Sequence, residues 1–464
     1  MSHRHKNRIV IQPTSRLIRK SPPDPRRGAF SILTETEAGR KDVSALIDDF
    51  LQRSRYDRRD EALLTELVYG VLRQQGFLDW QIDQFSKVPK IKTPIRNILR
   101  LGLYQLLFLD RIPTYALVNT SVNLAKSAGS EAAGRFVNAL LRTLIRSKES
   151  LPQPSRDDLG AFIAVSASHP EWMVRRWLAR FGEEATLDLC RANNESPPLT
   201  LRVNGLKTHR EQIVEELLQA GGSAEATSFA PEGVILKGLS IRSLSAYREG
   251  RFYIQDEAAQ LISHLVDPQP GETLLDLCAA PGGKTTHLAE LMGGKATIVA
   301  TDIDPERLVL VDENIQRLQT PGCRVEPIDI ALAADRHYDR ILVDAPCSAL
   351  GILRRIPEGK WRKPPSIIGA YAERQRDLLE KAFQHLKAGG RLIYVTCSTE
   401  PEENEDRAAA FSNAHPEMEV EDPRPSLPPP ARKFVSAPGY FTTALNSDKM
   451  DRFFAVRWIK KIEI

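Results

Sequence analysis

The segment TLLDLCAAPGGKTTHLAELM, at residues 273–292, establishes the fold class of the carboxyl-terminal part of the chain. It passes from a short apolar run through a turn of small residues into a helical pattern. Gly282 and Gly283 allow a backbone to approach a ligand closely, and a helix that begins there presents free N–H groups. The segment therefore predicts a strand, a ligand-binding loop and a helix.

The loop fits neither of two common nucleotide-binding patterns. A dinucleotide fingerprint needs GxGxxG, which is absent. A phosphate-binding P-loop needs a glycine five residues before its GK pair, and Cys278 stands there. S-adenosylmethionine is the remaining prediction, because Asp302 follows Gly282 by 20 residues, the spacing of a ribose-binding acid. Asp329 follows the next short strand and is predicted to contact the adenine amino group. An ordinary turn with a capping aspartate is the alternative.

From about residue 266, short apolar runs alternate with helical stretches. This alternation predicts βαβ units around a parallel, doubly wound sheet. The expected strands are 273–277, 296–301, 340–344 and 391–396, with helices at 305–318 and 371–386 among them. After the proline-rich stretch 426–432, GYFTTAL and RFFAVRW predict two strands that close the sheet as an antiparallel pair.

The rest of the chain predicts a multidomain protein. Residues 30–150 carry apolar positions at helical spacing throughout and predict an all-α bundle. Residues 151–265 mix helix and strand signals, which predicts a linker and a small α/β module. Residues 1–29 are expected to form a basic disordered tail, and residues 266–464 the α/β domain described above.

Composition narrows the class of protein. Of 464 residues, 42% are apolar and 27% charged, which is ordinary for a soluble globular chain. No apolar stretch approaches 18 residues, so no membrane partner is expected. The net charge of +4 divides into +7 for residues 1–27 and −3 for the remainder. A basic arm of this kind often follows a phosphate backbone, although a solvated end without a partner is the alternative.

The five cysteines indicate the redox compartment of the protein and two candidate site residues. They are scattered, odd in number and without a CxxC pair, so neither a disulfide framework nor a metal site is expected. Together with the absence of a secretion signal, they indicate a reducing cytoplasm. Cys347 and Cys397 stand apart, because each follows an expected strand, one ending at Asp344 and the other at Thr396. Carboxyl ends of neighbouring parallel strands are where doubly wound sheets bind ligands.

Two thiols at such an edge suit methylation of an unactivated carbon. Carbon 5 of cytosine cannot attack a methyl sulfonium unaided, whereas a thiolate that adds to carbon 6 turns the ring into an enamine-like nucleophile. Asp344 is expected to hydrogen-bond N3 and the amino group of the base. An amine acceptor would need no cysteine, since its lone pair attacks directly. A buried strand-end thiol is the structural alternative for each cysteine alone.

Three motifs resemble those of the NOL1/NOP2/Sun family of RNA (cytosine-5) methyltransferases. They are DLCAAPGGKT at 276–285, DAPCSALG at 344–351 and YVTCSTEPEENE at 394–405. The resemblance implies that Cys397 is the nucleophile and that Cys347 assists release of the methylated RNA. It also implies a cofactor site formed by Asp302, Asp329, Asp344 and the loop Cys278, Ala279, Ala280, Pro281, Gly282, Gly283 and Lys284. One departure is Leu350, where the family has a small polar residue.

The amino-terminal half adds a second resemblance. Segments 66–80, 99–119 and 135–142 are similar to the NusB-type RNA-binding helical domain, and 252–261 resembles the family's entry into its catalytic domain. A NusB-like domain before this catalytic domain is the layout of family members that methylate one cytosine of 16S ribosomal RNA in bacteria. The resemblance therefore implies small-subunit ribosomal RNA as partner, and a monomeric enzyme is expected.

Three alternatives remain at this point. In the first alternative, the enzyme methylates a transfer RNA or another site in ribosomal RNA. In the second, the chain is a non-catalytic RNA-binding or assembly factor, which predicts decay of catalytic residues. No such decay is seen, which disfavours that hypothesis: the chain keeps Lys284, Asp302, Asp344, Cys347 and Cys397. A DNA cytosine methyltransferase, the third, would use Cys347 alone and would not need Cys397.

Overall fold

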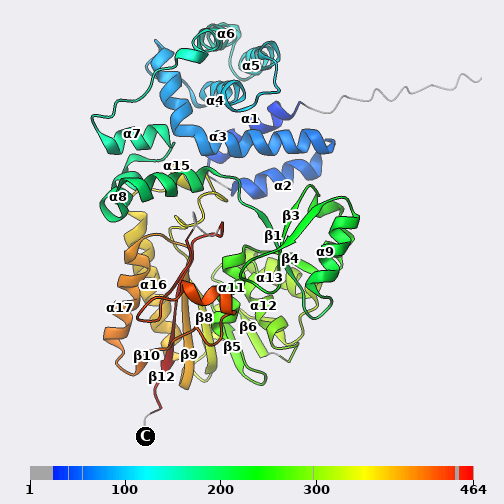
Figure 1. The fold of residues 1–464 in the computed structure, drawn as a ribbon, viewed down its shortest axis with the longest axis vertical. Coiled ribbons are helices and arrows are strands. Elements are labelled where there is room, and N and C mark those ends of the chain that lie inside the picture. Colours follow the sequence, from blue (N-terminus) through cyan, green and yellow to red (C-terminus); the bar gives the residue numbers. More distant parts are fainter. Residues whose placement is uncertain (1–23, 40, 55, 296, 445–448, 463–464) are drawn as a thin grey trace, which may run out of the picture. The chain divides into compact units, whose positions relative to one another are not determined.

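The computed structural model describes residues 24–39, 41–54, 56–295, 297–444 and 449–462 (Figure 1). It divides into a helical unit, residues 1–71 and 82–151, and a sheet unit, residues 72–81 and 152–464. None of the helices formed by these described residues combines the length and apolar content needed to cross a bilayer.

The helical unit confirms the predicted all-α bundle. Its helices pack through leucine-rich faces, such as Val137, Leu140, Leu141 and Leu144 in the last long helix. At Gly70 a Cβ would lie 2.0 Å from the Tyr104 ring, so only glycine allows this close crossing. The elements are α1 (Pro25–Glu37), α2 (Val43–Arg53), α3 (Arg58–Phe85), α4 (Thr93–Phe108), α5 (Thr114–Ala128), α6 (Glu131–Arg146) and the short η1 (Lys148–Ser150).

The expected tail ends earlier than residue 29. Helix α1 begins at Pro25, and Asp24 caps it by accepting a hydrogen bond from Arg26 N (2.9 Å). Gly28 and Ala29 are buried in the bundle. An aspartate cap followed by proline is a helix-start signal, and it outweighs the local positive charge. The predicted boundary is therefore wrong, and residues 1–23 lie outside the described part of the chain.

The sheet unit begins with two helices and a small antiparallel sheet, which confirms the predicted α/β module. Its four strands lie in the order β2-β3-β1-β4. Helix α9 packs on this sheet through the buried side chains of Ile213 and Leu217. The elements are α7 (Leu159–Ser166), α8 (Glu171–Asn194), β1 (Leu199–Val203), α9 (Arg210–Gln219), β2 (Ser223–Ala226), β3 (Gly233–Lys237), η2 (Ile241–Ser243), α10 (Ser245–Arg248) and β4 (Phe252–Ile254).

A large, mainly parallel sheet follows, in the order β10-β12-β9-β8-β5-β6-β7. Strand β12 closes it antiparallel to both β9 and β11, as the sequence predicts, whereas β10 is an addition. Its strands are β5 (Thr273–Asp276), β6 (Thr297–Ala300), β7 (Cys323–Val325), β8 (Tyr338–Asp344), β9 (Leu386–Thr396), β10 (Met418–Val420), β11 (Phe441–Thr442) and β12 (Phe454–Lys460). The helices are α11 (Glu257–Val266), α12 (Gly283–Leu291), α13 (Pro305–Leu318), α14 (Ile328–Ala331), α15 (Gly359–Arg362), α16 (Ile367–Gln384), α17 (Glu405–Ala414), η3 (Pro401–Glu403) and η4 (Pro429–Phe434).

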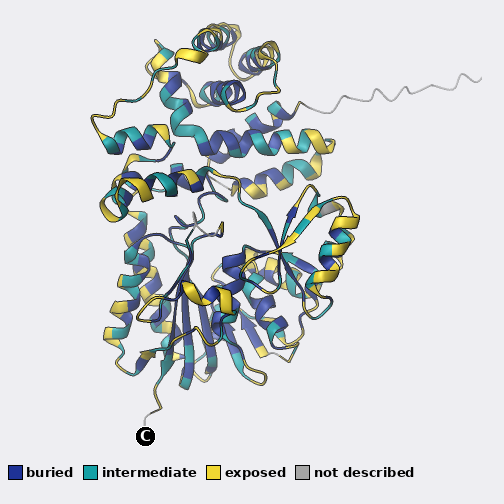
Figure 2. Cartoon of the chain, in the orientation of Figure 1, coloured by how far each residue is buried: buried dark blue, intermediate teal, exposed yellow. Residues whose placement is uncertain are grey.

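Helices cover both faces of this sheet, so most residues of its central strands are buried (Figure 2). Leu274 packs with α11 and α12, while its neighbour Leu275 packs with α16 and α17 on the opposite face. Because β5, β6, β8 and β9 run parallel, the loops that follow them meet at one edge of the sheet. That edge holds the residues singled out in the sequence.

Candidate active site

The loop from Cys278 to Gly282 joins β5 to α12 and is fixed by its own backbone. Gly282 N donates to Ala279 O (2.7 Å), and Gly282 adopts φ +98°, a conformation that favours glycine. At Gly283 a Cβ would lie 2.9 Å from the Tyr253 ring. Both glycines are thus required by close packing at the start of the helix.

Asp302 lies directly after β6 and faces this loop. Its carboxylate accepts hydrogen bonds from Asp304 N (3.1 Å) and Ala280 N (3.4 Å). The residue is 6% exposed, and it lines the adjoining cavity. A nearly buried carboxylate of this kind retains lone pairs that can accept from the hydroxyl groups of a ligand.

A cavity of about 490 Å³ opens at the carboxyl edge of the strands, within the size range of small-molecule sites. Six predicted site residues line it: Cys278, Ala280, Asp302, Asp344, Cys347 and Cys397. The other loop positions do not line it, namely Ala279, Pro281, Gly282, Gly283 and Lys284. Asp329 is exposed on α14 and does not line it either, although its neighbour Ile328 does.

The two predicted cysteines lie side by side. Their Sγ atoms are 3.2 Å apart, and Cys397 N also approaches Cys347 Sγ (3.4 Å). The hydrogen bond with Cys347, together with burial, raises the pKa of Cys397 well above its ordinary value. Cys397 is therefore held as a thiol, and any reaction through its thiolate needs a group that takes the proton.

Lys363 is the cation whose charge favours the thiolate form of Cys397. Its Nζ donates to Ser348 O, and burial lowers the pKa of its ammonium group, while the thiols oppose that shift. A lysine with a lowered pKa is neutral in a larger fraction of molecules than an exposed one, and only the neutral amine can take a proton. In its charged form the lysine favours a thiolate nearby. Nothing in the spacing of the sequence pointed to it.

Behind the cysteines, Glu403 joins the loops that carry them. It is fully buried, and its carboxylate accepts from Ser348 N (2.7 Å) and from Gln375 Nε2 (3.1 Å). The hydroxyls of Ser348 and Ser398 donate to its other oxygen. One carboxylate thus ties the residue after Cys347 to the residue after Cys397. The sequence signal is the acid-rich stretch that follows the second cysteine.

The carboxylate of Asp344 forms an ion pair with Lys284, at 2.5 Å between Oδ2 and Nζ. Burial opposes the charge on Lys284, but Asp344 more than compensates and raises the pKa of the lysine. Deeper in the site, burial raises the pKa of Asp276 to about 7, although Thr285 donates a hydrogen bond to it (2.7 Å). Lys284 therefore orients Asp344 instead of contacting the cavity.

Further lining residues were not predicted. Ile303 and Ile328 supply apolar side chains, and the polar wall is formed by Arg307, Tyr371, Arg374, Asp377 and Lys381. The departure at Leu350 has a packing explanation. Its side chain is fully buried among Met173, Trp177 and other apolar residues of α7 and α8, so it stabilises the loop after Cys347.

These features define a Rossmann-like methyltransferase domain: a doubly wound sheet, a small-residue loop after β5, an acid after β6 and a cavity at the strand ends. Family models agree with this class along the chain. "16S rRNA methyltransferase RsmB/F" matches residues 263–456, "NusB family" residues 23–146, and an RsmF/B-like ferredoxin-like domain residues 169–240.

Individual relatives extend the match over nearly the whole chain. "Probable ribosomal RNA small subunit methyltransferase B" of Bacillus subtilis is 34% identical over 447 residues, which is 93% of this chain and 98% of that protein. The crystal structure of PH0851 has a TM-score of 0.80 at 28% identity and covers 95% of this chain and 99% of that one. NSun6 from Pyrococcus horikoshii, solved with SFG, shares the fold at 23% identity, with a TM-score of 0.56 over 63% of this chain and 99% of its own.

The chain belongs to the RsmB/F family of 16S rRNA methyltransferases. The predicted family resemblance, the NusB-type domain and the methyltransferase fold are thereby confirmed.

Proposed function

We propose that this methyltransferase transfers the methyl group of S-adenosylmethionine to carbon 5 of a cytosine in 16S ribosomal RNA. The observation that carries the proposal is the pair of sulfur atoms 3.2 Å apart in the wall of a cavity that Asp302 and Asp344 also line. An amine or hydroxyl acceptor attacks through its own lone pair and has no use for two thiols. The names of the relatives support ribosomal RNA as the substrate.

The volume and the lining residues of the cavity support this cofactor. Asp302 would accept hydrogen bonds from the ribose hydroxyls, and Ile303 and Ile328 would flank the adenine ring. The loop between Cys278 and Gly282 would hold the methionine end, with Asp329 near the adenine amino group as a further proposal. S-adenosylmethionine bound there supplies an electrophilic methyl group, and the remaining chemistry belongs to the protein.

The reaction begins when the Cys397 thiol gives its proton to a base, a role proposed for Lys363 in its neutral form. The sulfur then adds to carbon 6 of the cytosine, and N3 takes up a proton from solvent. Carbon 5 then carries enamine-like electron density and takes the methyl group. Asp344, held by Lys284, would accept hydrogen bonds from the protonated N3 and from the amino group of the ring. A solvent base then removes the carbon 5 proton, the bond between carbon 6 and the Cys397 sulfur breaks with its electron pair on sulfur, and the N3 proton leaves, which restores aromaticity. Cys347 is proposed to assist this last step.

Asp302→Ala is expected to weaken S-adenosylmethionine binding by roughly 1–3 kcal/mol, since two ribose hydroxyls lose a charged acceptor. Isothermal titration calorimetry measures the change. Asp312→Ala, which removes an exposed acid from the neighbouring α13, serves as the control and should leave affinity unchanged. Equal affinities for the Asp302 variant and the parent protein would rule out the ribose assignment.

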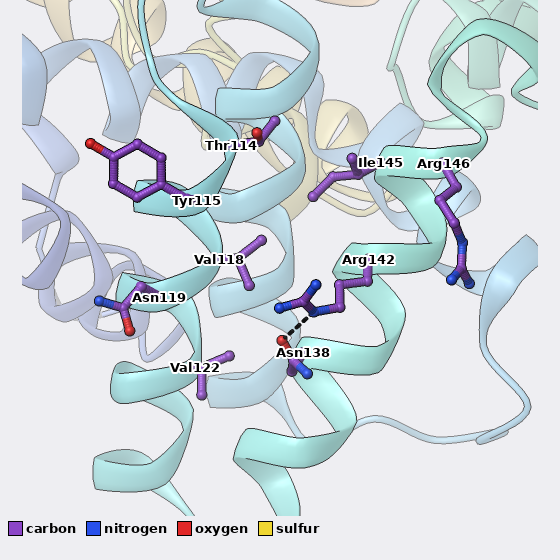
Figure 3. A pocket seen from close by; sticks show the side chains of 9 residues that line it. All are labelled: Thr114, Tyr115, Val118, Asn119, Val122, Asn138, Arg142, Ile145 and Arg146. Atoms are coloured by element: carbon purple, nitrogen blue, oxygen red, sulfur yellow. Dashed lines mark hydrogen bonds between the residues drawn. The ribbon is translucent and has the colours of Figure 1, made fainter.

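RNA contact by the helical unit is part of the same proposal. A groove between α5 and α6 has Val118, Val122 and Ile145 in its apolar wall, and Asn138 and Arg142 project from α6 (Figure 3). Arg142 Nε donates to Asn138 Oδ1 (3.0 Å). Residues 113–147 contain four Lys or Arg and only one acid. Exposed arginines beside polar amides favour a phosphate-bearing partner.

The double variant Arg142→Ala with Arg146→Ala is expected to weaken RNA binding and to lower the salt dependence. Each lost phosphate contact reduces the slope of log affinity against log salt by roughly 0.7–0.9. Fluorescence anisotropy with a labelled fragment of 16S ribosomal RNA, read across salt concentrations, measures both. Arg53→Ala with Arg59→Ala removes the same charge from exposed positions of the same unit. If both double variants change the slope alike, the groove has no particular role.

The substrate is tested by bisulfite sequencing of ribosomal and transfer RNA from a strain that lacks the gene. The proposal expects one cytosine of 16S ribosomal RNA to lose its protection from conversion, and the wild-type gene to restore it. Protection lost in a transfer RNA, with 16S ribosomal RNA unchanged, would redirect the substrate assignment.

A further inference from the structure

A second cluster of ligand-type side chains lies in the sheet unit, apart from the proposed reaction. Glu232 precedes β3, His264 lies on α11 and His287 on α12. Glu232 Oε2 lies 3.0 Å from His264 Nε2 and 3.8 Å from His287 Nε2. One donor atom from each residue can be chosen so that all three lie within 4.8 Å of one another. The two imidazole rings meet edge to face, with centroids 5.5 Å apart.

His287 is the second observation. Its side chain is fully buried, and among the described residues neither of its ring nitrogens has a hydrogen-bond partner. Buried polar atoms are rarely left without a partner, because an unpaired one costs free energy. An imidazole ring without a hydrogen-bond partner keeps a nitrogen lone pair that a ligand can use.

A hydrogen-bond network alone accounts for His264 but not for His287. His264 can donate to Glu232, whereas the nitrogens of His287 stay unsatisfied. The nearby Arg202 does not supply a partner, because it is occupied by Glu290 at 2.8 and 3.1 Å. His415 offers a contrast: it approaches Glu380 and Glu417 through opposite ring nitrogens, so no single ion could meet all three.

We propose that Glu232, His264 and His287 bind a divalent ion of the zinc type. Two imidazoles and one carboxylate, with a fourth position for solvent, form a common tetrahedral zinc donor set. The side chains of His264 and Glu232 are only 14% and 21% exposed, so both ligands are largely shielded from solvent. The ion would take the place of the hydrogen bond between His264 and Glu232, whose proton leaves to solvent, and would give His287 a partner.

The ion would connect the small antiparallel sheet to α12, the helix that follows the loop proposed to bind the cofactor. Glu232 belongs to the small α/β module, while His287 lies in the second turn of α12, which begins at Gly283. No spacing pattern in the sequence indicates this cluster, because the three ligands come from three separate elements. The proposal is independent of the methylation reaction, since no residue of that reaction takes part.

The experiment uses the full-length protein, freed of metal and then titrated with zinc chloride against a chromophoric chelator. One equivalent is expected to bind and to raise the melting temperature. His264→Ala and Glu232→Gln should each lower zinc affinity at least about tenfold, because even changes behind a ligand cost 10- to 100-fold. The exposed His209→Ala is the matched control and should bind zinc like the parent.

Cysteines 347 and 397 are the competing site for zinc, and X-ray absorption distinguishes the two. A shell of nitrogen and oxygen alone, near 2.0–2.1 Å, is expected for the proposed site, whereas thiolate ligands would add sulfur near 2.3 Å. A sulfur shell, no binding, or equal affinity in the His264 and Glu232 variants would overturn the proposal.

Discussion

Cys397→Ala is expected to abolish methyl transfer and to form no covalent bond to RNA, whereas Cys347→Ala is expected to accumulate a protein–RNA adduct. Without Cys397 nothing adds to carbon 6, so carbon 5 stays unreactive. Without Cys347 the attack and the methylation still proceed, but release is slowed. The adduct is measured as a band that survives a denaturing gel after incubation with RNA and S-adenosylmethionine.

Because the two sulfur atoms are only 3.2 Å apart, distance alone does not identify which thiol attacks. The two single variants therefore test the assignment directly. The double variant, with both cysteines changed to alanine, is the control and should show no band. Adduct in the Cys397 variant, and none in the Cys347 variant, would reverse the roles proposed for the two residues.

Glu403→Ala is expected to lower the free energy of unfolding by roughly 3 kcal/mol or more. It leaves several buried donors without an acceptor, and each such group costs about 1–3 kcal/mol. Turnover should fall about 100-fold as well, since misplacing reacting groups by an ångström has that effect. Chemical denaturation measures the stability, and single-turnover methylation measures the rate.

The adjacent acid provides the matched control. Glu402 forms an ion pair with Arg176 at 2.8 Å on a partly exposed surface, so Glu402→Gln should cost less than about 1 kcal/mol. S-adenosylmethionine affinity should be unchanged in Glu403→Gln, because Glu403 contacts the loops that carry the cysteines and does not line the cavity proposed for the cofactor. Equal rates for Glu403→Gln and Glu402→Gln would mean that Glu403 has no positioning role.

Much of this fold is predictable from local sequence, because its signals are local. A window of about a dozen residues is enough to predict the strand before Cys278, the helix at 305–318 and the strand that ends at Asp344. Parallel strands then bring their carboxyl ends together. That rule alone predicts that Asp302, Asp344 and the two cysteines approach one edge.

The contacts that complete the site depend on residues distant in sequence. Glu403 meets Ser348 across 55 positions, and no local pattern indicates which acid of its stretch turns inward. Leu350 looks like a departure from a motif until α7 and α8 are seen to surround it. The early start of α1 has a local cause instead, an aspartate cap followed by proline, which the positive charge of the tail concealed. Burial decides the cases of Glu403 and Leu350, and burial is a property of the folded chain.

The most direct test of the account follows the hydrogen on carbon 5. A 16S ribosomal RNA transcript carrying tritium at carbon 5 of its cytosines is incubated with the enzyme and S-adenosylmethionine, and tritium in water is compared with methyl groups in RNA. Methylation at carbon 5 through Cys397 predicts one tritium released for each methyl group gained, and none of either with Cys397→Ala. Methyl groups gained without release of tritium would place the methyl elsewhere on the nucleotide and would contradict the account.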